Sequence, residues 1–248
     1  HRLIKPPERT EGAQLDRDVA PRFLDRNDRS SVVNVTEAVE RRKSIRAFLD
    51  TPVSDEVLRT LLEKAARAPS GGNVQPWRIY VVNGDRMTDL LAHLADKDFE
   101  RPEYDVYPPG LHEPYRTNRF ALGEAMYEKL GIPREDKEAR LGHMGRNYVF
   151  FDAPCGLFCY IDRAMGPPQW SDLGMFLQTF MLLAQAAGLD TGPQEAWAMR
   201  HGAISEFVGA PENEMLFCGM AVGHADWDKP VNELHSERMP LDEWCRWV

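Results

Sequence analysis

The sequence contains little cysteine and no long uninterrupted hydrophobic run. Only four of its 248 residues are cysteines. Cys155 and Cys159 are separated by three residues, and no cluster of histidine and cysteine completes a zinc site around them. So few thiols favour reduced cysteines over a disulfide framework. The most apolar stretch, residues 173–189, contains two glutamines and a threonine, so we interpret it as a buried core helix and not as a membrane span.

Basic side chains are outnumbered by acidic ones in the chain as a whole. There are 39 acidic and 30 basic side chains, which gives a formal net charge of −9. This balance excludes a broad nucleic-acid-binding surface, because such a surface must neutralise many phosphates. Residues 1–30 are polar and charged and carry no secretory signal pattern. Together with the reduced thiols, this leads us to expect a cytoplasmic protein.

The common nucleotide-binding motifs are also missing. No strand is followed by GxGxxG and no GxxxxGK[ST] occurs, which excludes a Rossmann unit and a P-loop. Amphipathic helical patterns instead alternate with short apolar strands, and this order predicts an α+β fold with a mixed, mostly antiparallel sheet. Residues 1–33 have no clear hydrophobic period, so we expect an N-terminal arm there and a single domain over residues 34–248.

What the chain does contain is one concentrated basic segment, "RRKSIRAF", at residues 41–48. Four cations surround Ser44 in an otherwise acidic protein. A solvated helix end, a nucleic-acid patch and a phosphate clamp are three interpretations of such a cluster. Arginine binds phosphate with two parallel hydrogen bonds, and a serine hydroxyl adds another donor. The segment alone leaves these alternatives open.

A second unusual segment, "APSGGNVQPW", follows at residues 68–77. Its proline and two glycines allow the backbone to approach a flat ligand closely. The amides of Asn73 and Gln75 can pair with the edge of a heterocycle. Taken alone, the segment is also typical of a loop that ends a helix. Its occurrence shortly after the basic segment favours a shared ligand-binding function.

The two segments together carry a family resemblance. The pattern R-R-x-S-x-R-x-F is met by Arg41, Arg42, Ser44, Arg46 and Phe48. The pattern A-P-S-x-x-N-x-Q-P-W is met by Ala68, Pro69, Ser70, Asn73, Gln75, Pro76 and Trp77. Two weaker matches are "GLDTGPQEAW" at residues 188–197 and "ERMPLDE" at residues 237–243. Over roughly residues 35 to 245 the chain resembles the FMN-dependent nitroreductase superfamily, which includes bacterial nitroreductases and iodotyrosine deiodinase.

The resemblance implies a three-layer α+β fold and an intertwined homodimer with FMN at its interface. It places the phosphate and ribityl chain of FMN beside one group of residues, comprising Arg42, Lys43, Ser44, Arg46 and Arg238. It assigns a second group to the partner chain, comprising Pro69, Ser70, Gly71 and Asn73. A third group, Gln194, Glu195 and Ala196, would present a backbone N–H to flavin N5. Some relatives carry a lysine where this chain has Ser236, so phosphate binding depends more on Arg238.

The activity that the resemblance implies is reduction of nitroaromatic compounds with NADH or NADPH by a ping-pong mechanism. The flavin performs the redox chemistry, and we assign no catalytic side chain and no metal ligand. Reductive dehalogenation or quinone reduction on the same fold is an alternative. A flavin-binding redox sensor without turnover is the alternative from a different functional class.

Substrate choice is expected to depend on an excursion at about residues 100–150, which is rich in proline and tyrosine and has the character of a lid. Aromatic side chains stack on planar substrates, and arginine binds carboxylate or nitro groups. The candidates are Tyr115, Arg116, Arg119 and Tyr127. In the alternative interpretation the tyrosines cover a dimer interface and the arginines pair with Glu113 and Glu124.

Overall fold

A computed structural model describes residues 33–248, and the predicted N-terminal arm lies outside the described residues except for residue 33. The strands are β1 (Phe48–Leu49), β2 (Trp77–Asn83), β3 (Cys155–Asp162), β4 (Asp190–Gln194) and β5 (Glu214–Ala225). The α-helices are α1 (Val35–Arg41), α2 (Asp55–Ala65), α3 (Asp85–Leu94), α4 (Tyr115–Lys129), α5 (Lys137–Gly145), α6 (Pro167–Ala186), α7 (His201–Val208) and α8 (Leu241–Trp244). The 3₁₀ helices are η1 (Gly71–Asn73), η2 (Arg146–Asp152), η3 (Glu195–Arg200) and η4 (Pro230–Glu233).

The five strands form one sheet with the order β1-β5-β3-β2, and β4 also pairs with β5. Every one of these strand pairs is antiparallel. A single parallel bridge connects Ser44 to Thr191 beside β4. The predicted α+β class with a mostly antiparallel sheet is confirmed. The bridge matters for function, because it attaches the basic segment to the sheet.

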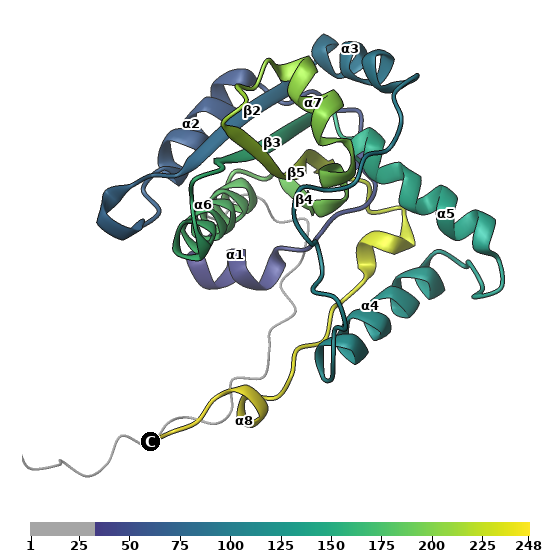
Figure 1. The fold of residues 1–248 in the computed structure, drawn as a ribbon. Helices are drawn as coiled ribbons and strands as arrows, with labels where there is room; N and C mark the ends of the chain where they lie inside the picture. Colours follow the sequence, from purple (N-terminus) through teal and green to yellow (C-terminus); the bar gives the residue numbers. More distant parts are fainter. Residues whose placement is uncertain (1–32) are drawn as a thin grey trace, which may run out of the picture. The chain divides into compact units, whose positions relative to one another are not determined.

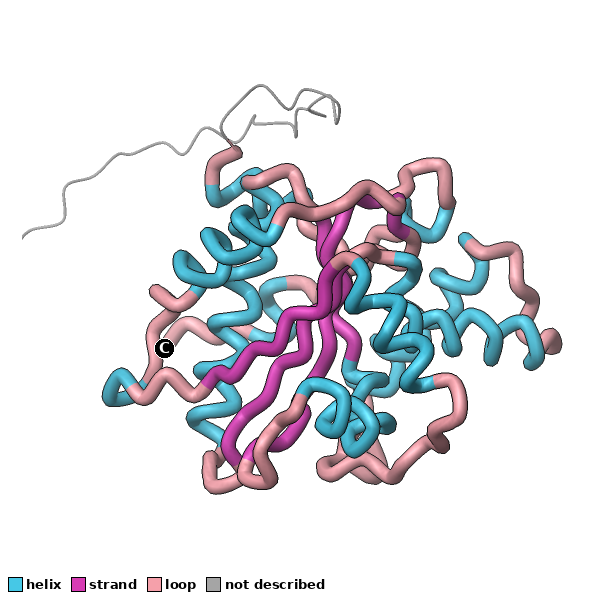
Figure 2. The backbone as a smooth tube through the Cα atoms, turned by 90° about the horizontal axis from the view of Figure 1, so that it is seen from above, coloured by secondary structure: helices cyan, strands magenta, loops and turns pink. Residues whose placement is uncertain are grey.

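Helices cover both faces of the sheet, as Figure 2 shows for the strands that run between them. Strand β3 is buried along nearly its whole length and supplies both cores, because successive side chains of a strand point to opposite faces. Leu157 and Ile161 pack with α2 and α6 in one core. Phe158 and Tyr160 pack with α3 and α7 in the other. The result is three layers of helix, sheet and helix.

The helix ends agree with the sequence patterns to different degrees. Asn34 caps α1 as predicted, since its side chain accepts a hydrogen bond from the backbone N–H of Glu37 in a capping box. Ser54 occupies the N-cap position of α2, but its side chain makes no capping hydrogen bond. The predicted core helix at residues 173–189 is α6, which begins earlier, at Pro167. Burial of one face of α2 and of α6 against the sheet therefore decides these helices more than their caps do.

The predicted excursion at residues 100–150 contains α4 and α5, which lie away from α2 in Figure 1. Helix α4 buries none of its side chains within the described chain. Helix α5 buries a single residue, His143. Of the helices in the described part of the chain, none is long and apolar enough to cross a membrane.

Candidate functional site

The basic segment is held in an extended conformation by two buried anchors. Asn232 is only 1% exposed, accepts a hydrogen bond from the backbone N–H of Arg46 at 2.9 Å and donates to the carbonyl of Ala47 at 2.8 Å. The backbone N–H of Ile45 donates to the carbonyl of Thr191 at 3.0 Å. These bonds satisfy the backbone of the segment and leave its polar side chains to other partners.

Three arginines near this segment have no anionic partner among residues 33–248. Arg42, Arg46 and Arg238 form no ion pair there with any carboxylate. Burial, and then the charge of Arg238, lower the pKa of Arg42. Burial also lowers the pKa of Arg46, whose guanidinium donates to the carbonyl of Ser44 at 3.0 Å. Arg42 and Arg46 are partly buried, and the exposed Arg238 is close enough to act on Arg42, so this group of cations without an anion is suited to phosphate.

The other members of the predicted phosphate group are oriented differently. Lys43 donates to the carbonyls of Asn232 and Glu233, at 3.4 and 3.2 Å, so its ammonium group is directed at the C-terminal segment. Arg238 donates to the carbonyl and hydroxyl oxygens of Ser236, at 2.8 and 2.7 Å. Ser236, which stands where some relatives carry a lysine, therefore orients Arg238 and adds no positive charge of its own.

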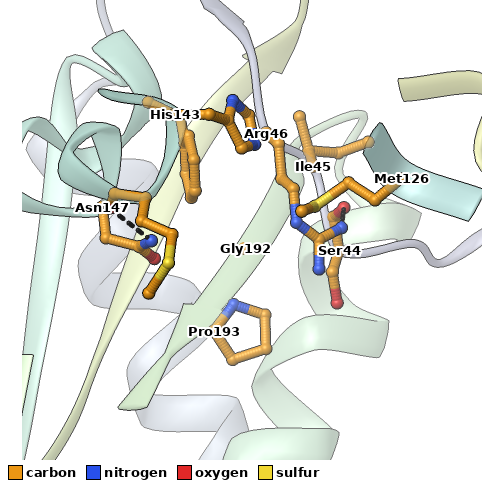
Figure 3. Close-up of a pocket in the computed structure, with 10 residues that line it drawn as sticks. Ser44, Ile45, Arg46, Met126, His143, Asn147, Gly192 and Pro193 are labelled. Carbon is orange, nitrogen blue, oxygen red and sulfur yellow. Dashed lines mark hydrogen bonds between the residues drawn. The ribbon is translucent and has the colours of Figure 1, made fainter. Parts of the chain in front are cut away.

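A cavity of about 190 Å³ opens beside the basic segment. It is lined by Ser44, Ile45, Arg46, Met126, His143, Met144, Asn147, Phe151, Gly192 and Pro193, most of which Figure 3 labels. A glycine is required at position 192, because a Cβ there would lie 2.5 Å from the carbonyl oxygen of Ile45. The close approach of β4 to the basic segment therefore forms the floor of this cavity.

The predicted flavin-facing segment follows directly on β4. Gln194 is buried, and its amide donates to the carbonyl of Asn147 at 2.8 Å, so the side chain fixes the cavity wall. The carbonyl of Ala196 accepts a hydrogen bond from the hydroxyl of Tyr148 at 3.2 Å. Glu195 is exposed, but desolvation by the neighbouring protein still raises the pKa of its carboxyl group. Of these three residues, none lines the cavity itself.

The second predicted segment, residues 68–77, lies away from the cavity in the folded chain. Its loop connects α2 to β2 and, in Figure 1, sits on the opposite side of the molecule from α4 and α5. The loop is held by its own bonds, such as that from the backbone N–H of Gln75 to the hydroxyl of Ser70 at 3.1 Å. The backbone N–H of Gly71 donates to the buried carboxylate of Asp172 at 3.2 Å. Pro69, Ser70, Gly71 and Asn73 are all absent from the cavity lining.

The four candidate substrate residues lie on α4 but do not line the cavity. Arg116 forms an ion pair with Glu113 at 2.7 Å, which is one of the pairs that the alternative interpretation expected. Glu124, the other expected partner, pairs with Arg140 at 2.6 Å. Arg119 stacks over the ring of Tyr107 at 4.0 Å. The residue of α4 that does reach the cavity is Met126.

Tyr115 and Tyr127, the aromatic candidates of α4, have different surroundings. Tyr115 is 54% exposed and packs edge-on against His112. The ring of Tyr127 lies under the guanidinium of Arg140 at 4.1 Å. Tyr115 is therefore available to a ligand from outside, whereas Tyr127 already serves the contact between α4 and α5.

Sequence reasoning missed the cavity residues that come from α5 and η2. His143 and Asn147 are spaced four residues apart, which places them on one helical face, and this spacing is the signal that was available. His143 is 7% exposed. Burial, followed by the charges of Arg146 and Arg46, lowers the pKa of His143 to about 4.

Comparison with known proteins gives matches over most of the chain. The model of the nitroreductase family matches residues 39–224. The chain is 37% identical over 219 residues to a nitrobenzene nitroreductase of Ectopseudomonas oleovorans, covering 86% of this chain and 96% of that protein. It is 49% identical to an NADH dehydrogenase of Thermus thermophilus, covering 87% and 97% of the two chains.

A solved structure gives the same result for the fold. The crystal structure of the FMN and NADPH-dependent nitroreductase NfnB from Sphigopyxis sp. strain HMH superposes with a TM-score of 0.83 at 45% identity. The match covers 87% of this chain and 99% of that one. The basic segment, the loop of residues 68–77 and β4 lie within the family match, whereas Arg238 follows its last residue, 224.

Proposed function

The chain belongs to the nitroreductase family, and we propose that it is an FMN-dependent NAD(P)H oxidoreductase that reduces nitroaromatic compounds. The observation that carries this proposal is the group of three arginines that have no anionic partner among the described residues, one of which, Arg46, lines the cavity. Arg42 and Arg238 are close enough to lower the pKa of Arg42, which costs free energy unless an anion binds between them. A phosphate monoester is the anion that matches two guanidinium groups and a serine hydroxyl.

The residues present fit FMN, a planar ring system with a phosphate at the end of a ribityl chain. Arg42, Ser44 and Arg238 would hold the phosphate and the ribityl chain, and Arg46 would reach the ring. Gly192 allows the backbone to form a flat floor, and Pro193 extends that floor with an exposed apolar ring. The neutral character of Met126 and Phe151 suits the aromatic part of the ligand.

The proposed mechanism uses the cavity for two substrates in turn. When bound, FMN would supply the hydride chemistry for both the nicotinamide and the nitro compound. The protein would position both reactants over the same floor, with Met126 and Met144 as apolar groups in the cavity wall. No side chain is assigned as a catalytic acid or base. NADH and NADPH are both candidate donors.

We also propose that the functional unit is a homodimer of a single FMN-binding domain, residues 34–248. The loop of residues 69–73 does not reach the cavity of its own chain. Contribution of this loop to the flavin site of a second copy would explain why both segments carry the family pattern. Val35 and Val39 of α1 are 75% and 54% exposed, which supplies apolar surface for such a contact. A cytoplasmic location is proposed from the four free cysteines.

The test is an anaerobic absorption spectrum of the purified protein before and after addition of NADH or NADPH. We expect a flavin spectrum that is bleached by a nicotinamide and restored by nitrobenzene. Initial rates at varied concentrations of both substrates should give parallel double-reciprocal lines, as ping-pong kinetics require. A protein that cannot be loaded with FMN would refute the proposal, and a flavin that no nicotinamide reduces would favour a redox sensor.

A further inference from the structure

The imidazole of His143 is a buried polar group for which the proposed function has so far no use. The residue is 7% exposed and lines the cavity. Within residues 33–248 neither ring nitrogen has a hydrogen-bond partner, and Nε2 is fully enclosed. Its ring neighbours are Tyr127 and Phe151, with centroids at 6.2 and 5.9 Å. Buried polar groups are nearly always hydrogen-bonded, and Nδ1, the ring nitrogen that is not enclosed, is therefore the one left for a ligand in the cavity.

The surroundings determine what kind of ligand group this is. The charged groups that act on the ring are Arg46 from the basic segment and Arg146 from η2, and both disfavour a third positive charge. With its pKa lowered to about 4, the imidazole is neutral near pH 7 and offers one N–H donor and one acceptor. Because Nε2 is enclosed, the ligand meets only Nδ1, and a neutral group that can donate or accept fits this nitrogen in either tautomer.

We propose that His143 is a further flavin-binding residue, which hydrogen-bonds the polar edge of the isoalloxazine ring next to Arg46. This inference rests on the proposed function, because it requires FMN in the cavity. Figure 3 shows the ring of His143 beside the Arg46 side chain, above the floor made by Gly192 and Pro193. The pyrimidine part of the flavin carries carbonyl oxygens and a ring N–H, so it can bond Nδ1 whether this nitrogen donates or accepts.

The other polar side chain on this wall is already engaged. Asn147 accepts hydrogen bonds from the amide of Gln194, at its backbone carbonyl and at its side-chain oxygen, at 2.8 and 3.2 Å. Its own amide donates to the carbonyl of Met144 at 2.9 Å. Among the described residues on this side of the cavity, His143 therefore retains its hydrogen-bonding capacity for the flavin.

The test compares His143→Leu with His143→Gln by titrating the apoprotein with FMN and following the quenching of flavin fluorescence. Leucine removes both polar functions, whereas the glutamine amide retains a donor and an acceptor. Loss of an ordinary hydrogen bond weakens binding about tenfold. We expect His143→Leu to weaken FMN binding by about that factor and His143→Gln to stay within roughly threefold of the unaltered protein.

The matched control is His93→Leu, since His93 is a part-buried histidine that bonds to the carbonyl of Ala203 at 3.0 Å, outside the cavity lining. This variant should bind FMN as the unaltered protein does. Equal affinity of His143→Leu and the unaltered protein, or equal losses for leucine and glutamine, would overturn the inference. Failure of the unaltered protein to bind FMN would refute the proposed function itself, and with it the role of His143.

A second measurement is made on the unaltered protein and uses variants for assignment and comparison. Selective ¹⁵N labelling of histidine in the unaltered protein gives ring-nitrogen resonances, and His143→Gln identifies the pair that belongs to this residue. We expect FMN to move these resonances to hydrogen-bonded positions, and His143→Leu to alter the visible spectrum and reduction potential of the bound flavin. Resonances of His143 that do not respond to FMN would refute a direct contact.

Discussion

The two sequence segments that carry the family pattern differ in how the fold treats them. The basic segment, residues 41–48, is bonded to the buried Asn232 and to β4, and its Arg46 lines a cavity. The loop of residues 68–77 lies between α2 and β2 and bonds mainly to itself. One segment is assembled into a site by its own chain, whereas the other is presented at a surface. Proximity in sequence, about 25 residues, therefore does not imply proximity within one folded chain.

The difference is also electrostatic. The basic segment holds Arg42 and Arg46 partly buried and without carboxylate partners among the described residues, which stores unfavourable free energy until an anion binds. The loop contains no charged residue between Ala68 and Trp77. Its contribution is backbone geometry, with positive φ values of 58° at both Gly72 and Asn73. Changes in the two segments should therefore affect different measurements.

The largest effect is expected from Gly192→Ala. The new Cβ would lie 2.5 Å from the carbonyl oxygen of Ile45, a backbone atom, so β4 and the basic segment must separate. Overpacking of this kind costs ~1–3 kcal/mol of stability, and the displaced arginines should weaken FMN binding by roughly a hundredfold or more.

Thermal unfolding and FMN titration measure the two consequences of this change. Gly123→Ala is the control, because a Cβ on that residue of α4 meets nothing within 4 Å. An alanine at 192 that leaves FMN affinity intact would show that the close approach of β4 is not needed for the site.

The next effect is expected from Arg46→Ala and Arg238→Ala. Hydrogen bonds to charged groups contribute ~1.5–3 kcal/mol, so each change should weaken FMN binding by roughly 10- to 150-fold. Riboflavin, which lacks the phosphate, sharpens the assignment. Arg238→Ala should reduce the preference for FMN over riboflavin, whereas Arg46→Ala should weaken both ligands because Arg46 is assigned to the ring.

Arg59→Ala, an exposed arginine on α2, is the matched control and should leave both affinities unchanged. If Arg238→Ala keeps the full preference for FMN, the phosphate lies elsewhere.

The fold was predictable from the sequence where local pattern and burial agree. Strands β2, β3 and β5 follow apolar runs that end at turn residues, and α2 follows a stripe of leucines. Strand β4 was not recognised as a strand, because Asp190, Gly192 and Pro193 are poor strand formers. Tertiary contacts decide this element, since it pairs with β5 along its length and receives the basic segment on its other side.

The site was predictable only where a resemblance supplied it. The arginines and the Gly192 region were found through motifs, but Met126, His143 and Asn147 were not. These residues come from the excursion of residues 100–150, in which the spacing of His143 and Asn147 indicates a shared helical face but not that this face turns toward a cavity. Helix α4 illustrates the difficulty, because its side chains are all at least partly exposed, so no apolar stripe marks the one residue that reaches the cavity.

A mixed dimer of two variants tests whether the loop of residues 68–77 and the arginines of one flavin site come from different chains. If the loop serves the cavity of a second copy, Arg238→Ala and Asn73→Ala each damage both sites of their own homodimer. A mixed dimer of the two variants then has one site with an intact arginine and an intact loop. Random mixing after unfolding and refolding should restore about a quarter of the FMN sites, from the two-fold symmetry of such a dimer.

The measurement is flavin content per chain after mixing, compared with each variant refolded alone. If the mixed sample binds no more flavin than the separate variants do, the loop and the arginines act within one chain. The distance between the two segments in Figure 1 argues against this outcome. A recovery limited to tagged, co-purified mixed dimers would confirm that the restored site is shared.

The smallest effect is expected from Gly72→Ala, and its contrast with Gly192 separates two reasons for a glycine. Gly72 has a φ of 58°, but a Cβ added to it would meet nothing within 4 Å, so alanine there costs only the left-handed backbone, ~1–2 kcal/mol. For a protein of this size, each kcal/mol lowers Tm by about 2–4 °C. Gly72→Asn should recover most of this loss, because asparagine tolerates the conformation. A loss as large as that of Gly192→Ala would mean that the loop packs tightly against a second chain, and the segment would then be as constrained in the dimer as the basic segment is within one chain.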